Sequence, residues 1–182
     1  MLLSIVIGFV LIGLAVGLLL AVGAVQAKVP APPVPALDAL FKKWGEVYRV
    51  DWRLLKAHAI RESSLNPNAV NRADNSSYGL AQILCRPNAQ GVCTNKRVDE
   101  LAREGRLQGW PPPRGGVQLL EPDYNVWIQA QLVARNIEDF GMPRAVAVYN
   151  MDSQRHAQRN GPFQNQAYVN KVLLYYEELK NV

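Results

Sequence analysis

The sequence is poor in metal-binding side chains, with only two cysteines and two histidines among its 182 residues. Cys85 and Cys93 are separated by seven residues rich in turn formers, and neither His58 nor His156 lies at a recognised zinc spacing from them. This scarcity argues against a structural metal centre. Two alternatives stay open for the cysteines, a small disulfide loop in an oxidising compartment or two free thiols.

The sequence also lacks long runs of basic residues, although lysine and arginine give it a formal net charge of +5. No basic run is longer than two residues, which argues against nucleic acid as a partner. A scattered positive surface fits an anionic partner such as a cell-wall polymer or lipid headgroups, or simply a solvated surface.

Charge is absent altogether from residues 1–27, and residues 2–25 are apolar or glycine apart from Ser4. A helix of this length crosses the hydrocarbon core of a lipid bilayer, so residues 1–27 are predicted to be a transmembrane anchor. A cleaved signal peptide is the alternative, because residues 25–27 have the small-residue spacing of a cleavage site. The lysines that flank the span all follow it, which by itself favours a cytoplasmic domain.

The rest of the chain divides into a proline-rich spacer over residues 28–36 and one domain over residues 37–182. The domain shows helical periodicity and no sustained two-residue alternation, so an all-α fold is expected. Asp51 is the predicted N-cap of the second helix, and residues 85–121 are expected to be mostly loop around one short helix. The expected helices cover residues 37–48, 52–63, 97–105, 122–140, 143–150 and 162–180.

Glu62 lies near the end of the second expected helix, in line with Leu55 and Ala59 on the face that packs into the core. Burial raises the pKa of a carboxylic acid and keeps a proton available for donation near neutral pH. The alternative is a helix-end glutamate that reaches solvent. His58, one turn earlier, is interpreted as a packing residue.

Four motifs follow in order: "ESSLNPNAV" from Glu62, "YGLAQI" from Tyr78, "VAVYN" ending at Asn150, and "AYVNKVLLYY" from Ala167. This ordered set resembles the catalytic domain of the soluble lytic transglycosylases, which is related to goose-type lysozyme. The resemblance implies a lysozyme-like helical domain with Glu62 as the single catalytic acid. It also implies a substrate-binding set that consists of Ser63, Tyr78, Gly79, Gln82, Tyr149, Asn150 and Tyr168.

The activity implied by the resemblance is cleavage of the β-1,4 bond between N-acetylmuramic acid and N-acetylglucosamine in peptidoglycan, with formation of a 1,6-anhydro end. The substrate's own N-acetyl group assists, so no cofactor and no metal is expected. A hydrolytic muramidase is the close alternative, in which Asp74 is the candidate second carboxylate. The second alternative is a membrane component that binds glycan without cutting it.

Some positions depart from the family pattern. Met151 and Asp152 follow Asn150 where Ala-Gly is usual, Gln129 replaces a small residue, and Ala81 stands where methionine is common.

The resemblance implies that the domain acts in the bacterial periplasm or cell wall. Such a domain belongs to an envelope enzyme, to a secretion or conjugation machine, or to a phage virion that opens the wall for genome entry. The positive charges that follow the span oppose export of the domain by the ordinary route. A virion protein delivered from outside avoids this constraint, so the virion setting is favoured.

Overall fold

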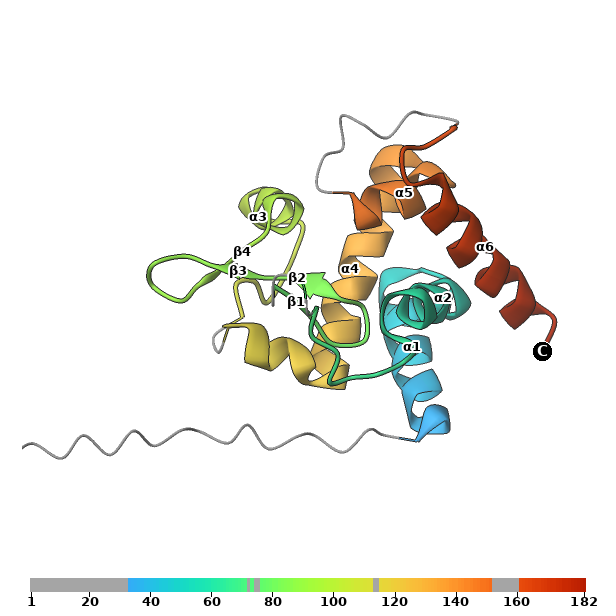
Figure 1. The fold of residues 1–182 in the computed structure, drawn as a ribbon, viewed down its shortest axis with the longest axis horizontal. Coiled ribbons are helices and arrows are strands. Elements are labelled where there is room, and N and C mark those ends of the chain that lie inside the picture. Colours follow the sequence, from blue (N-terminus) through green and yellow to red (C-terminus); the bar gives the residue numbers. More distant parts are fainter. Residues whose placement is uncertain (1–32, 72, 74–75, 113–114, 152–160) are drawn as a thin grey trace, which may run out of the picture.

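The computed structural model describes residues 33–182 except 72, 74–75, 113–114 and 152–160 (Figure 1). The predicted anchor, residues 28–32 of the predicted spacer, Asp74 and Asp152 therefore lie outside the described residues. Within the described ranges, no helix is long and apolar enough to cross a membrane. The predicted transmembrane segment stays a prediction.

Helices make up most of the described structure, as expected. The second begins and ends as predicted because Asp51 accepts a hydrogen bond from the Arg53 N–H at 3.0 Å and Ser64 takes the left-handed conformation that stops the helix. The main helices are α1 (Val34–Tyr48), α2 (Trp52–Ser63), α3 (Lys96–Arg103), α4 (Pro122–Phe140), α5 (Arg144–Asn150) and α6 (Gln166–Lys180).

Two helix starts differ from the prediction by more than one residue. α1 begins at Val34, inside the predicted spacer, because a proline is tolerated in the first helical turn, where its missing N–H has no partner to lose. α6 begins at Gln166 rather than at Pro162, because Phe163 turns into the core. The Gln166 side chain then accepts the Phe163 N–H at 2.9 Å, ahead of the first turn.

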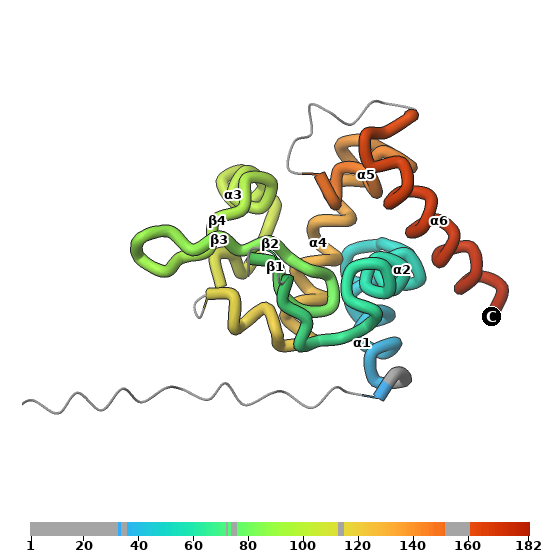
Figure 2. Tube along the Cα trace, viewed as in Figure 1, coloured from blue at the N-terminus to red at the C-terminus, as the bar shows by residue number. Residues whose placement is uncertain are grey.

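α2 packs against α1 and α6, and α4 packs against α1 and α5 (Figures 1 and 2). Apolar side chains at helical spacing on each of these helices meet in one core, as the predicted stripes require. The fully buried part of this core includes Phe41, Leu55, Ala59, Val126, Ala130, Val146, Val169 and Val172.

The expectation of a purely α-helical domain is wrong for the segment between α2 and α3. Two small antiparallel hairpins lie there, β1 (Ser77–Tyr78) with β2 (Ile83–Leu84) and β3 (Arg86–Pro87) with β4 (Cys93–Thr94). Each strand has two residues, too few to show an alternating pattern in the sequence. A short 3-10 helix, η1 (Gly115–Leu120), leads into α4.

A disulfide between Cys85 and Cys93 closes the second hairpin, and both cysteines are buried. They belong to a second core, formed with Val98 and Leu101 of α3 and Ile128 of α4. This second core fastens the hairpins and α3 to the helical framework.

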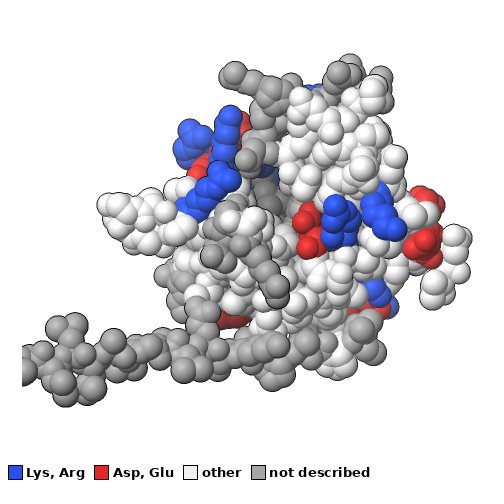
Figure 3. All heavy atoms as spheres, in the orientation of Figure 1, with Lys and Arg blue, Asp and Glu red and all other residues white. Residues whose placement is uncertain are grey.

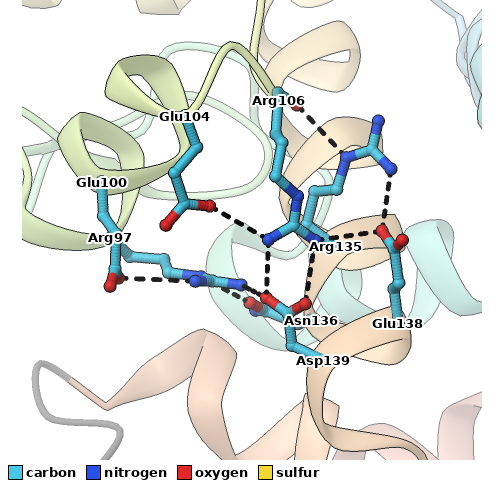
Figure 4. A network of polar contacts seen from close by, with 8 residues as sticks. All are labelled: Arg97, Glu100, Glu104, Arg106, Arg135, Asn136, Glu138 and Asp139. Atoms are coloured by element: carbon cyan, nitrogen blue, oxygen red, sulfur yellow. Dashed lines mark hydrogen bonds and ion pairs between the residues drawn. The ribbon is translucent and has the colours of Figure 1, made fainter.

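Hydrogen bonds and ion pairs join α3 and the residue Arg106 after it to the C-terminal part of α4 (Figure 4). Arg97 of α3 bonds Asn136 at 3.1 Å, and Arg106 bonds Glu138 at 3.0 Å and Asp139 at 2.8 Å. On the face drawn in Figure 3, charged residues form separate small groups with basic and acidic members close together. This agrees with the scatter of basic residues along the sequence.

We predict that replacing both cysteines with alanine lowers the free energy of unfolding by about 2 kcal/mol, since the unfolded chain is no longer cross-linked. Urea denaturation of the wild type with and without reductant, beside Cys85→Ala/Cys93→Ala, measures this. Reductant should lower the wild-type midpoint toward that of the variant and leave the variant unchanged. A wild-type midpoint that does not respond to reductant would contradict the prediction.

Candidate active site

Glu62 sits in the last turn of α2 and borders an open cavity of about 550 Å³. The cavity runs between the end of α2, the β1–β2 hairpin, α3 and the end of α5. Among the described residues that line it, Glu62 is the one carboxylate. The sequence placed this acid on a helix face that turns inward, and the structure puts it at the wall of a cleft.

Tyr168 of α6 donates a hydrogen bond to Oε1 of Glu62 at 2.6 Å. Burial raises the pKa of Glu62 above its ordinary value, while this hydrogen bond and the nearby Arg61 charge work in the opposite direction. Burial and the same carboxyl raise the pKa of Tyr168, so its hydroxyl keeps its proton. The outcome is an acid that holds its proton more tightly than an exposed glutamate does.

His58 stands behind this pair and is 1% exposed. Its Nδ1 lies 3.0 Å from the Tyr168 hydroxyl, and its ring centroid is 4.5 Å from that of Tyr149. Burial lowers the pKa of His58 to about 3, so the ring is neutral. The sequence-based interpretation of His58 as a packing residue did not include this contact with Tyr168, the residue that bonds Glu62.

Gly79 lies in the turn between β1 and β2 with φ of +77°, a conformation that glycine adopts without strain. A Cβ at this position would collide with the Leu119 carbonyl oxygen and the Asn125 side chain. Gly79 therefore shapes the turn rather than lining the cavity. Tyr78, beside it, is also absent from the described cavity lining.

Asn125 of α4 holds this turn in place and was not anticipated from the sequence. It is fully buried, accepts the Ala81 N–H at 2.8 Å, and donates to the carbonyl oxygens of Tyr78 at 2.9 Å and Leu119 at 2.8 Å. The signal for it was weak, because it is one of several polar residues in a helix whose apolar residues form the predicted stripe.

Gln82, Tyr149 and Asn150 line the cavity, and their predicted contacts with substrate stay predictions. The Gln82 amide nitrogen bonds the carbonyl oxygens of Ala69 at 3.1 Å and Gly79 at 3.0 Å, which holds its side chain across the turn. The Tyr149 hydroxyl donates to the Ala81 carbonyl at 2.9 Å. These side chains present amide and ring surfaces to the cleft.

Two of the predicted substrate-binding residues, Ser63 and Tyr168, bond other protein groups and are not among the described residues that line the cavity. The Ser63 hydroxyl lies 2.8 Å from the Leu80 carbonyl oxygen and 3.1 Å from that of Ala59, and so joins the end of α2 to the turn that carries Gln82. Tyr168 is 5% exposed and reaches the site only through Glu62. Their predicted contacts with substrate stay predictions.

The far wall of the cavity comes from residues that the motifs did not identify. Amide and basic side chains of the loop before β1, the disulfide hairpin, α3 with its N-cap, and α4 make it polar. These residues are Asn71, Arg86, Asn95, Lys96, Arg97 and Asn136. No cluster of three or more His, Cys, Asp or Glu side chains in the described part of the chain is arranged to hold a metal ion.

Comparison with known proteins supports the interpretation of this cleft. A family model described as the transglycosylase SLT domain matches residues 39–171. No curated protein sequence matches the chain. The fold is similar to that of a 70-kDa soluble lytic transglycosylase solved in complex with bulgecin A, with a TM-score of 0.59 and 23% sequence identity. The match covers 79% of this chain and 24% of that protein.

The raised pKa of Glu62 has a consequence for stability. A carboxyl with a raised folded-state pKa contributes stability below its unfolded pKa and loses it as the pH rises through the folded value. Glu62→Gln stays neutral and keeps an oxygen for Tyr168. We therefore predict that this variant melts at a higher temperature than the wild type at neutral pH. The difference should shrink in mildly acidic solution.

Calorimetry at both pH values tests this, with Glu46→Gln as the matched control, because Glu46 is exposed on α1. The control should melt like the wild type at each pH. Equal melting temperatures for Glu62→Gln and the wild type at neutral pH would mean that burial does not perturb this carboxyl.

Proposed function

Because the chain belongs to the transglycosylase SLT domain family, we propose that it cleaves the glycan strands of peptidoglycan as a lytic transglycosylase. The bond cut is the β-1,4 bond between N-acetylmuramic acid and N-acetylglucosamine. The observation that carries the proposal is the carboxyl of Glu62, set at the wall of an open polar cleft with a raised pKa.

The chemistry follows from that one carboxyl group. Protonated Glu62 donates its proton to the glycosidic oxygen as the bond to the anomeric carbon breaks. The N-acetyl oxygen of the muramic acid stabilises the developing positive charge, so a second carboxylate is not needed. The Glu62 carboxylate then removes the proton of the muramic 6-hydroxyl, whose oxygen attacks the anomeric carbon to close the 1,6-anhydro ring.

The side chains around the cleft suit a sugar polymer. Asn150 lines the cleft and is exposed, so its amide suits the N-acetyl groups of the sugars. Tyr149 contributes part of a ring face, on which the apolar side of a sugar packs. An open cleft, rather than a closed pocket, lets a long strand pass through.

We predict that the full-length protein, purified in detergent, releases muropeptides with anhydro-muramic ends from isolated peptidoglycan. Glu62→Gln should release them at least about a hundredfold more slowly, because it cannot transfer the proton. Mass spectrometry of the soluble products measures this. Glu46→Gln serves as the matched control and should behave like the wild type.

Two other outcomes would replace the proposal. Reducing ends, lost in the Glu62→Gln variant, would make the protein a hydrolytic muramidase and direct attention to Asp74. The absence of cleavage by folded wild-type protein, with glycan binding equal in wild type and variant, would favour the membrane component that binds glycan without cutting it.

We further propose that residues 2–25 anchor the protein in a lipid bilayer and that the domain works in the periplasm or cell wall. The support is the uncharged apolar run in the sequence and the location of the proposed substrate. The full chain should then stay in the membrane pellet after alkaline carbonate extraction, and a variant without residues 2–25 should be released. Digestion of the domain by protease added to intact spheroplasts would place it outside the cytoplasm, whereas protection from the protease would contradict that location.

The wider setting stays a prediction. Local opening of the wall, for phage genome entry or for a secretion or conjugation machine, requires partner proteins from the virion or from the secretion complex. The polar cleft is compatible with each of these roles, because each uses the same bond cleavage.

A further inference from the structure

We propose that His58 is a positioning residue for the reaction, which acts through Tyr168 to decide which oxygen of Glu62 carries the transferable proton. The proposal rests on the function proposed above. It concerns a buried, polar side chain to which that mechanism gives no task. Three side chains form the relevant chain of hydrogen bonds, from His58 to Tyr168 to Glu62.

The directions of these bonds follow from counting protons. The Tyr168 hydroxyl has a single hydrogen, which it donates to Oε1 of Glu62 at 2.6 Å. The bond of 3.0 Å between the Tyr168 oxygen and His58 Nδ1 must then be donated by the imidazole. His58 is therefore the tautomer with its proton on Nδ1, and Tyr168 cannot turn its hydrogen away from the acid.

The consequence lies at the two oxygens of Glu62. Oε1 accepts a hydrogen bond, so the proton of the neutral acid resides on Oε2. In the first step this proton goes to the glycosidic oxygen as the bond to the anomeric carbon breaks. In the second step Oε2 takes the proton of the muramic 6-hydroxyl as its oxygen bonds the anomeric carbon. The proton of Tyr168 stays where it is throughout.

The surroundings of His58 keep this arrangement fixed. The ring of Tyr149 from α5 packs 4.5 Å from the imidazole centroid and limits its rotation. Burial keeps the imidazole neutral, so it has one ring proton over the working pH range. A buried imidazole needs a hydrogen-bond partner whatever its role, and here that partner is the hydroxyl that bonds Glu62.

The other ionisable groups near the cluster are few among the described residues. Arg61 of α2 lies over the Tyr168 ring at 5.4 Å and favours the charged form of Glu62. From α1, Asp38 pairs with Lys56 of α2 at 2.7 Å. α4 contributes Gln129, which is uncharged and bonds the Leu55 carbonyl at 2.9 Å. His58 is thus the group that fixes the direction of the Tyr168 hydroxyl.

The test compares His58→Asn, His58→Leu, Tyr168→Phe and the double variant His58→Leu/Tyr168→Phe in the full-length protein. Asparagine keeps an N–H donor near the position of Nδ1, whereas leucine keeps the volume and removes the donor. kcat and KM are measured against pH with peptidoglycan. The titration of Glu62 is followed by NMR of its labelled carboxyl carbon, which does not depend on activity.

We expect His58→Leu to lower kcat by up to about tenfold with KM little changed, because one hydrogen bond between neutral groups is worth at most about that factor. Without the imidazole donor the phenol is a weaker donor to the carboxylate, so the pKa of Glu62 rises. The high-pH limb of the activity profile then moves to higher pH. His58→Asn should stay close to the wild type in both measurements.

The double variant separates positioning from packing. If His58 acts through Tyr168, adding His58→Leu to Tyr168→Phe should change neither kcat nor the Glu62 titration further. Additive losses, or a His58→Leu variant with an unchanged Glu62 titration, would overturn the proposal and leave His58 as a packing residue. Wild-type protein that cuts no glycan would refute the proposed function, and the NMR titration would still decide the role of His58.

Discussion

The hydrogen bond between Tyr168 and Glu62 joins the last helix to the helix that carries the acid, across 106 residues of sequence. It forms only when α6 is packed on α2, which the buried Val169 and Val172 accomplish. The bond holds the carboxyl against a buried hydroxyl, so the pKa of Glu62 reflects both burial and this partner. Core packing and the chemistry of the acid therefore depend on the same contact.

The turn that carries Gln82 depends on a different set of contacts. Asn125 supplies two hydrogen bonds to its backbone from the first turn of α4 and a third to Leu119 of η1, and Ser63 joins the turn to the end of α2. The Tyr149 hydroxyl adds a further bond from α5. Helices from separate parts of the chain thus fix one short turn relative to Glu62, which keeps the acid and the Gln82 side chain at a constant separation.

The disulfide hairpin and α3 give this domain a polar wall of its own. Their buried side chains form the second core, and Arg97 and Arg106 tie α3 to α4 at the surface. Because the hairpin is covalently closed and α3 is clamped, Asn95 and Lys96 face the cleft from a rigid support. The departures from the family pattern, such as Met151, concern the shape of the cleft and leave the reacting carboxyl in place.

The sequence by itself determined the helices, because Asp51, the prolines and Gly141 mark their ends locally and apolar periodicity marks their inner faces. It also determined the family, since the motifs lie in unbroken order along the chain, and it predicted Glu62 as the acid. Only the tertiary structure decided the two-residue strands, the support from Asn125 and the place of His58 behind Tyr168. The strands pair residues five to eight positions apart and are too short to show an alternating pattern. The bonds of Asn125 to Ala81 and of His58 to Tyr168 join residues 44 and 110 positions apart, and no local pattern records such contacts.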